Sequence, residues 1–404
     1  MLTGQNRILN RAIGARDKTA IAQQEENNIL NKYEEQISNY VGINWEEAKA
    51  NAKAPEGQKE ERNKGVIGIG TDGKPVNMDL WEYTRLNDGN YGLNTKEAFN
   101  NKEVGGNNET NISTMGYKGD FKDGKIIGKV PQYISVDNGK NYKEITSMYI
   151  TFINCKELKE APDIPETVSN LMGTFVGNSN LMTVKALPSY VINLTSTFYE
   201  CSSLSYIGNL PSKGLQSMPF TFYACENLEN IPSIPNEVQN MRATFAGCSK
   251  LKEISKFPDL LINMEGTFSG CRSLTNVPNI PLNVINMKRA FYQCTNLIAI
   301  SNIPNKVENM NDTFKYCTNL RNCPPIPESV TNMLATFSYC ENLQGELEIN
   351  ANLNGKIVLN NYKDYDDCLM GATKGNRISL KVYGKCDKLD EIVASANNEN
   401  VTKK

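Results

Sequence analysis

The residue types that usually carry catalysis are sparse in this sequence, and histidine is absent from all 404 positions. Without histidine the chain has no Ser-His-Asp or Cys-His nucleophile pair, and no metal site can include an imidazole ligand. Acidic residues occur at variable positions along the chain, so we interpret them as solvated surface rather than as the paired carboxylates of a glycosidase. We therefore expect no catalytic residue and a protein that is not an enzyme.

Cysteine is the second candidate for chemistry, because the chain contains eleven. Three of them, Cys323, Cys368 and Cys386, stand apart from the other eight, which recur at one position of a repeat. An odd total with one cysteine per repeat is not a disulfide framework, and Cys317 and Cys323 have no third and fourth ligand nearby for zinc or an iron–sulfur cluster. We expect the recurring cysteines to be small buried apolar side chains, with pairing or metal binding as the alternative. The recurring ones are Cys155, Cys201, Cys225, Cys248, Cys271, Cys294, Cys317 and Cys340.

Two short motifs are similar to ligand-binding loops but lack the residues that such loops require. Residues 65–70 read GVIGIG, yet no Lys-Ser/Thr pair of a phosphate loop follows, and Asp72-Gly73 turns the chain instead. Residues 137–141 read DNGKN without the downstream glutamate of a calcium loop. We expect turns at both places and no bound cofactor.

Tyrosine is the residue type whose placement suggests a binding surface. Tyr199, Tyr223 and Tyr292 directly follow a recurring phenylalanine, and Tyr316 and Tyr339 lie one position later. Stacked repeats would bring some of these rings together on one face, where they could contact a protein or a sugar. The alternative is that the rings only pack over neighbouring repeats and keep their hydroxyl groups in water.

The element that positions all of these residues is a repeat with a period of 23 residues. A Met or Leu lies four residues before each recurring phenylalanine, an Asn or Ser precedes that residue, a Leu lies six after the phenylalanine, and an Ile-Pro type pair follows. Nine copies predict an α/β solenoid, a leucine-rich-repeat array in which each coil stacks on the next. The phenylalanines are Phe152, Phe175, Phe198, Phe222, Phe245, Phe268, Phe291, Phe314 and Phe337, with steps of 23 except one of 24.

The expected coil follows from these positions. Met, Phe, Cys and Leu point inward and stack on their copies, because a single coil cannot bury this face alone. The Asn amide should bond to the backbone at a turn and form an internal ladder from coil to coil. The Thr-Phe-x-x-Cys segment is expected to make a helical turn, with short strands at Leu-x-x-Ile and Val-x-Asn-Met.

These patterns resemble the bacterial leucine-rich-repeat surface proteins of the BspA type, whose repeat joins a Phe-x-x-Cys-x-x-Leu core to Pro and Val-x-Asn-Met elements. Residues 240–251 (NMRATFAGCSKL) and 263–274 (NMEGTFSGCRSL) are the clearest copies. The resemblance covers about half of the chain and implies a non-enzymatic adhesion protein, secreted or on the cell surface, that binds a host or bacterial surface protein or glycan. Asn178 in place of a recurring cysteine and one extra residue before Phe222 are local departures.

The N-terminal region carries a second resemblance. Residues 1–50 are expected to form an amphipathic helix and a short second helix, and residues 2–12 (LTGQNRILNRA) resemble the part of a type IV pilin-like helix that follows its membrane-spanning half. The sequence has no apolar run near the ~20 residues of a membrane span and no signal peptide. Export, and an anchor upstream of Met1, are therefore inferred from resemblance alone. If this resemblance holds, the alternative function of the protein is a pilin-like structural subunit that displays the solenoid on a filament. For the helix itself, the simpler interpretation is a plain helix docked on the β-rich domain, or a coiled-coil segment.

Turn signals give the remaining domain boundaries, and the net charge limits the classes of partner. Four hairpin-type turn signals, from Asp72-Gly73 to Asn138-Gly139, predict a small β-rich domain. A net charge of −2 at pH 7 provides no basic excess for nucleic acid or anionic lipid. We expect no nucleic-acid partner, and membrane association only through a missing upstream anchor. The predicted regions after residue 50 are a linker at 51–64, the β-rich domain and N-terminal cap at 65–145, the solenoid at 146–343, and a C-terminal cap at 344–404 that includes a degenerate coil at 366–372.

Overall fold

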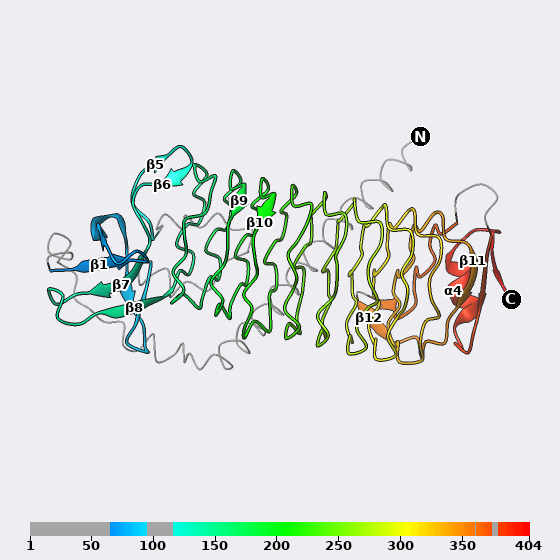
Figure 1. Ribbon diagram of the computed structural model, residues 1–404. Coiled ribbons are helices and arrows are strands. Elements are labelled where there is room, and N and C mark those ends of the chain that lie inside the picture. Colours follow the sequence, from blue (N-terminus) through cyan, green and yellow to red (C-terminus); the bar gives the residue numbers. More distant parts are fainter. Residues whose placement is uncertain (1–64, 95–115, 360, 374–378) are drawn as a thin grey trace, which may run out of the picture. The chain divides into compact units, whose positions relative to one another are not determined.

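The computed structural model of the protein describes residues 65–94, 116–359, 361–373 and 379–404. All of these residues belong to one compact unit of the chain, and within it Figure 1 shows successive coils stacked side by side between the strands labelled β8 and β11. The N-terminal helices predicted at 1–50 and the linker predicted at 51–64 lie outside the described residues. No helix among the described residues is long and apolar enough to cross a membrane.

A six-stranded sheet precedes the coils, with the strand order β2-β1-β7-β8-β4-β3. The β4–β8 pair is parallel and the other pairs are antiparallel, while β5 and β6 form a separate hairpin. All four predicted hairpin turns are confirmed, since Gly73, Gly89, Gly124 and Gly139 have φ between 71° and 84° and each connects two paired strands. The elements are β1 (Ile67–Gly70), β2 (Pro75–Val76), η1 (Met78–Leu80), β3 (Thr84–Arg85), β4 (Tyr91–Gly92), β5 (Phe121–Lys122), β6 (Lys125–Ile126), β7 (Pro131–Ser135) and β8 (Lys143–Ser147).

The recurring phenylalanines form one continuous internal column, as predicted. All nine side chains are fully buried, and neighbouring rings stack at 5.4–5.7 Å between centroids with interplanar angles of 2–16°. At the N-terminal end, Trp81 and Tyr117 lie 5.9 and 5.8 Å from the Phe152 ring. Trp81, directly after η1, and Tyr117 therefore cover the first ring of the column.

The Thr-Phe-x-x-Cys segment is a ribbon of tight turns, so the helical turn predicted there is wrong. Thr244 N donates to Met241 O at 3.1 Å within its coil, whereas Phe245 N donates to Thr267 O of the next coil at 2.9 Å. This alternation recurs along the array. An α-helix would direct its amides to carbonyls four residues back and leave few to join the coils, which explains why turns replace it. The only α-helix among the described residues is α4 (Leu389–Ser395), beyond the coils.

Cysteine and threonine side chains add hydrogen bonds between coils. From Cys201 onward, each recurring Sγ lies 3.0–3.1 Å from a phenylalanine carbonyl oxygen of the preceding coil. The threonine hydroxyls bond in the same way to the Met or Leu carbonyl of the preceding coil at 2.7–2.9 Å. The cysteines are buried as predicted, but they are also hydrogen-bond donors and not merely apolar.

The asparagine column bonds to backbone as predicted, although the predicted ladder of amides is wrong for the described residues. Each Oδ1 accepts from the backbone N–H two residues later at 2.9–3.1 Å, so the amides cap their own coil and do not bond to one another. Coil-to-coil pairing comes instead from parallel β-bridges between these residues. The bridges are interrupted between Asn193 and Ser217, where the repeat has its extra residue.

The coils continue beyond Leu343 into the C-terminal part. Phe337 N donates to Cys368 O at 2.8 Å, which places Leu369 in the phenylalanine position and Ala372 in the cysteine position of a further coil. A three-stranded parallel sheet, with the order β11-β14-β15, and α4 follow. The remaining strands are β9 (Thr183–Val184), β10 (Tyr206–Ile207), β11 (Gly345–Glu348), β12 (Ile357–Leu359), β13 (Tyr362–Lys363), β14 (Leu380–Tyr383) and β15 (Val401–Lys403).

Candidate binding face

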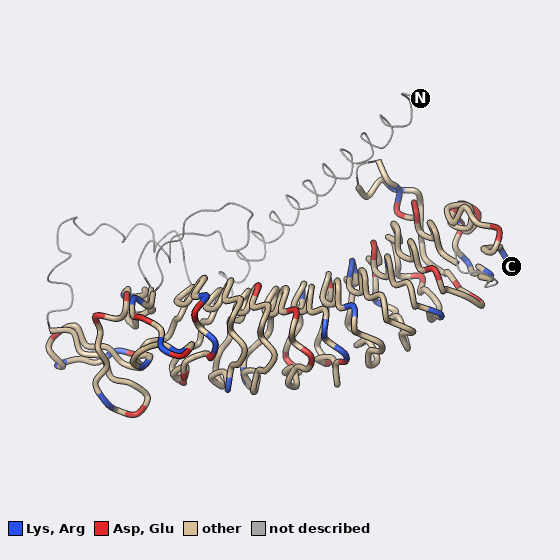
Figure 2. The backbone as a smooth tube through the Cα atoms, turned by 90° about the horizontal axis from the view of Figure 1, so that it is seen from above, with Lys and Arg blue, Asp and Glu red and all other residues tan. Residues whose placement is uncertain are grey.

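The turn ribbons give the array a distinct side, which we call the turn face. It consists, in each coil, of the two residues after the column Met or Leu and the two residues after the column Phe. Most of these side chains, including the five tyrosines, do not belong to the continuous hydrophobic core. Figure 2 shows basic and acidic residues scattered along the coils, without a large block of one sign. Any specificity of the turn face must therefore come from local groups of residues.

The five predicted tyrosines form two clusters on the turn face. The Tyr199 and Tyr223 rings stack at 4.6 Å with an interplanar angle of 4°, and Phe220 lies 6.2 Å from Tyr223. In the second cluster Tyr316 stacks on Tyr339 at 4.9 Å and meets Tyr292 edge to face at 5.8 Å. The rings do pack over neighbouring coils, and all five tyrosines are half-buried.

Two coils with small side chains separate the clusters. Ala246 and Ser269 occupy the positions that Tyr223 and Tyr292 hold in the flanking coils, and Gly247 and Gly270 follow them. A Cβ added to Gly247 would lie 3.1 Å from the Cα of Ala224, so the coils approach closely here. Stacking thus brings some of the tyrosines together, as predicted, in two separate clusters.

A stack of polar side chains, which the repeat pattern did not predict, runs through the two coils that separate the clusters and on into the coils of Tyr292 and Tyr316. Arg242, Glu265, Lys288 and Asn311 hold the position after the column Met in four successive coils, and we call them the polar column. Glu265 Oε2 lies 3.6 Å from Arg242 Nε, and Oε1 lies 3.3 Å from Lys288 Nζ. Only 2% of Arg242 is exposed, and its Cζ lies 5.1 Å from the centre of the Phe220 ring.

A second charged group adjoins the polar column. Asp312 Oδ2 accepts a hydrogen bond from Arg289 Nε at 3.3 Å, and Asp312 Oδ1 lies 3.2 Å from Lys315 Nζ. Burial alone would lower the pKa of Lys315, but the Asp312 carboxylate outweighs it and holds this pKa above its usual value. Burial also raises the pKa of the Tyr292 hydroxyl. Lys315 therefore stays charged, and Tyr292 stays protonated, at neutral pH.

One sequence signal could have revealed the polar column. The residue after the column Met varies from coil to coil, so no single copy indicates a function for it. Aligning the coils shows Arg242, Glu265 and Lys288 in consecutive register, with alternating charge. Such a series predicts an ion-pair chain once the coils are known to stack.

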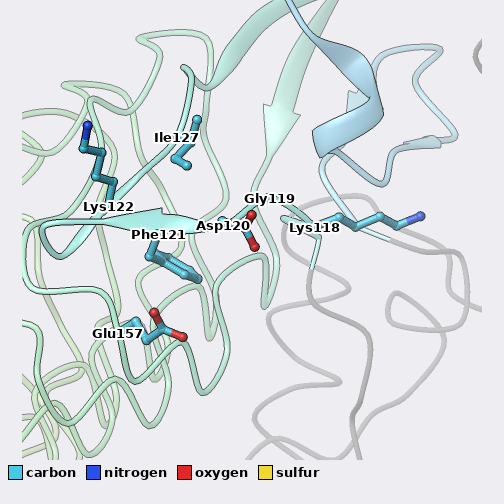
Figure 3. A pocket seen from close by; sticks show the side chains of 7 residues that line it. All are labelled: Lys118, Gly119, Asp120, Phe121, Lys122, Ile127 and Glu157. Carbon is cyan, nitrogen blue, oxygen red and sulfur yellow. The ribbon is translucent and has the colours of Figure 1, made fainter.

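One hollow on the described surface is lined by seven residues of the N-terminal part and the first coil. It has a volume of about 710 Å³ and lies between the β5–β6 hairpin and the first coil. It contains two carboxylates, Asp120 and Glu157, which come from different segments, and Figure 3 shows Lys118 and Lys122 extending away from each other. Lys118 is already paired with Glu82. No group of three or more His, Cys, Asp or Glu side chains in the described part of the chain could hold a metal ion.

Comparison with known proteins identifies the repeat. The pattern of the BspA type leucine rich repeat region matches residues 134–243 and 217–344, in six copies. No curated protein matches the chain significantly in sequence. No comparison supports the predicted pilin-like helix, since the matched residues begin at 134.

Solved structures of leucine-rich-repeat proteins are similar in fold. A protein from Bacteroides ovatus is 19% identical, covers 81% of this chain and 98% of its own, and gives a TM-score of 0.41. A leucine rich cell surface protein from Faecalibacterium prausnitzii is 15% identical, with 69% and 95% covered and a TM-score of 0.29. The pneumococcal vaccine antigen PcpA is 13% identical, with 71% and 91% covered and a TM-score of 0.28. At these values the likeness carries no argument about activity or partners.

Proposed function

Because the chain belongs to the BspA-type leucine-rich-repeat family, we propose that it is a non-enzymatic recognition protein of the cell surface. In this proposal it adheres to a protein or glycan of a host or neighbouring cell through the turn face. The proposal includes an extracellular location at the cell surface.

The observation that carries the proposal is the grouping of aromatic and cationic side chains on the turn face. Tyrosine and arginine are the residue types that contribute most to binding at protein interfaces. Tyr199 and Tyr223 lie in the two coils before that of Arg242, and the second cluster begins with Tyr292 in the coil of Lys288. The hydrogen-bonded coils hold these side chains in place before binding, which lowers the entropy cost of association.

The pilin-like alternative has no observation of its own. It requires the helix predicted in residues 1–50, and these lie outside the described residues. A filament subunit would also use the turn face, since the solenoid would remain its displayed part. We therefore retain adhesion as the proposed function.

A binding screen tests the proposal. The full chain is compared with a variant lacking residues 241–309, which removes three periods in register and most of the polar column, on arrays of host glycoproteins and bacterial polysaccharides. The double variant Tyr292→Ser/Tyr316→Ser tests the second tyrosine cluster, and Tyr206→Ser is its control, because Tyr206 is 56% exposed on β10, away from the turn face.

The expected result is a partner that binds the full chain and the Tyr206 variant, and that the deletion and the tyrosine double variant bind at least about tenfold more weakly, as loss of interface hot spots implies. Equal binding by all four proteins would contradict a role for the turn face.

A further inference from the structure

Unsatisfied polar atoms gather at the polar column and directly beside it. Among the described residues, eight buried side-chain nitrogen and oxygen atoms have no hydrogen-bond partner. Four of the eight belong to the polar column and the asparagine beside it: Nη1 and Nη2 of Arg242, Nδ2 of Asn263 and Oδ1 of Asn311. Native proteins leave few such atoms unpaired, so a local concentration calls for a physical cause.

Arg242 is the costliest member of this group. Glu265 approaches only its Nε, at 3.6 Å, and the Phe220 ring contacts the guanidinium without accepting a hydrogen bond. A charge removed from water without full pairing is strongly destabilising. The two free Nη groups form the planar fork that binds a carboxylate through two parallel hydrogen bonds.

The neighbouring coil is accessible beside Arg242. Glu265, Gly266, Ser269 and Gly270 are half-buried, and none has a bulky apolar side chain that would fill the gap between the tyrosine clusters. The charges of the whole group are also unbalanced. Among the described residues, the ion pairs of this region join four cations, Arg242, Lys288, Arg289 and Lys315, to two carboxylates, Glu265 and Asp312.

We propose that the turn face at Arg242 binds a carboxylate side chain presented by an acidic segment of a protein partner. This proposal rests on the proposed function and specifies the chemistry of its partner. The carboxylate accepts from Nη1 and Nη2 of Arg242, whose side chain turns outward from Phe220 to meet it. The new ion pair then supplies the acceptor that the unbound protein lacks.

Two observations favour a polypeptide over an acidic polysaccharide. Asn263 Nδ2 requires an acceptor and Asn311 Oδ1 requires a donor, and an extended backbone offers both groups. The Tyr199–Tyr223 and Tyr316–Tyr339 pairs stack face to face, so part of their ring surface is already occupied by the partner ring. Flat ring faces, on which sugars would stack, are therefore less available than ring edges and hydroxyl groups.

Fluorescent oligo-glutamate and oligo-glutamine peptides of equal length are the probes, used with the full chain at physiological salt. We expect the oligo-glutamate peptide to bind and the oligo-glutamine peptide not to bind. Arg242→Gln should weaken oligo-glutamate binding at least about tenfold, the scale of losing a buried charge pair. Arg272→Gln is the matched control, because Arg272 is exposed and lies outside the turn face, and it should leave binding unchanged.

A stability measurement separates a binding role from a structural one. Arg242→Met removes the unpaired charge and keeps an apolar side chain of similar length, so thermal unfolding should occur at the same or a higher temperature while peptide binding is lost. A lower unfolding temperature for Arg242→Met would show that Arg242 stabilises the fold, and this would overturn the proposal.

Other outcomes also overturn it. Equal binding of the two peptides, or equal loss in the Arg242 and Arg272 variants, excludes a specific carboxylate site. Binding of polygalacturonate but not of oligo-glutamate would assign the site to a polysaccharide. If the partner found in the binding screen is insensitive to Arg242→Gln, this inference fails while the proposed function stands. If the deletion and tyrosine variants also bind that partner normally, both fail.

Discussion

At the scale of single residues, the interior of this array is specified by hydrogen bonds as much as by apolar contact. From Cys201 onward, the thiols of the cysteine column donate to phenylalanine carbonyls of the preceding coil. The threonine hydroxyls likewise donate to the Met or Leu carbonyls of that coil. Burial raises the pKa of the column thiols, and that of Cys155, in the first coil, to about 12. Each phenylalanine carbonyl also accepts from a backbone N–H of its own coil, as Phe245 O does from Cys248 N at 3.0 Å. A valine would fill similar space but would lose the second hydrogen bond, which the thiol of the next coil donates, and this favours cysteine at the position.

Asn178 shows what happens when the column residue changes. It takes the cysteine position, is fully buried, and has no hydrogen-bond partner for either amide atom. We predict that Asn178→Cys raises the free energy of unfolding by about 1–3 kcal/mol, the usual cost of an unsatisfied buried polar group. Urea unfolding of the full chain measures this. The reverse change in the next coil, Cys201→Asn, should be destabilising, and a stability of Asn178→Cys below that of the unmodified protein would refute the explanation.

At the scale of elements, the turn ribbon is the part that the sequence could not predict. Two positions in every coil have φ > 0, the second residue after the column Met or Leu and the second residue after the column Phe. Glycine marks such turns, but here it fills only some of the positions, and Ala243, Arg289, Asp312 and Tyr316 fill others with φ between 48° and 64°. Contacts with the adjacent coils override the local preference.

The inward columns, in contrast, were predictable because their residue types barely vary. Phenylalanine, leucine and asparagine recur in register, and periodicity alone places them inside or at the turns. The polar column was not predicted for the opposite reason, since its residues differ in every coil and acquire meaning only from their stacked neighbours Arg242, Glu265 and Lys288. That stacking brings some tyrosine rings into contact was predictable, while their division into two clusters depends on Ala246 and Ser269.

The close approach of adjacent ribbons can be tested with two glycines. Gly247 has φ +78° and its added Cβ would lie 3.1 Å from Ala224 Cα, whereas Gly73 has φ +71° and would meet nothing within 4 Å. Both Gly→Ala changes incur about 1–2 kcal/mol of left-handed backbone strain. We predict a larger loss of stability for Gly247→Ala, measured by chemical denaturation of both variants. Equal losses would mean that the coils are not packed as closely as described.

At the scale of the whole molecule, the coils are a one-dimensional array in which each coil is stabilised by its neighbours. Such arrays keep their binding side chains in fixed register and change them without changing the core. In the proposed function the fixed columns supply stability and the turn face supplies specificity, so the two tasks reside in different positions of the same 23-residue unit. This separation is the basis for placing recognition, and not catalysis, on the array.

Thiol labelling followed by mass spectrometry tests most directly that identical side chains form internal columns. The full chain is exposed to a small thiol reagent with and without denaturant, and each cysteine is quantified. The seven column cysteines from Cys201 to Cys340 are fully buried with raised pKa values, so we predict that they stay unlabelled in native buffer and react together as the array unfolds. Labelling of these thiols in native buffer as fast as in denaturant would contradict the account.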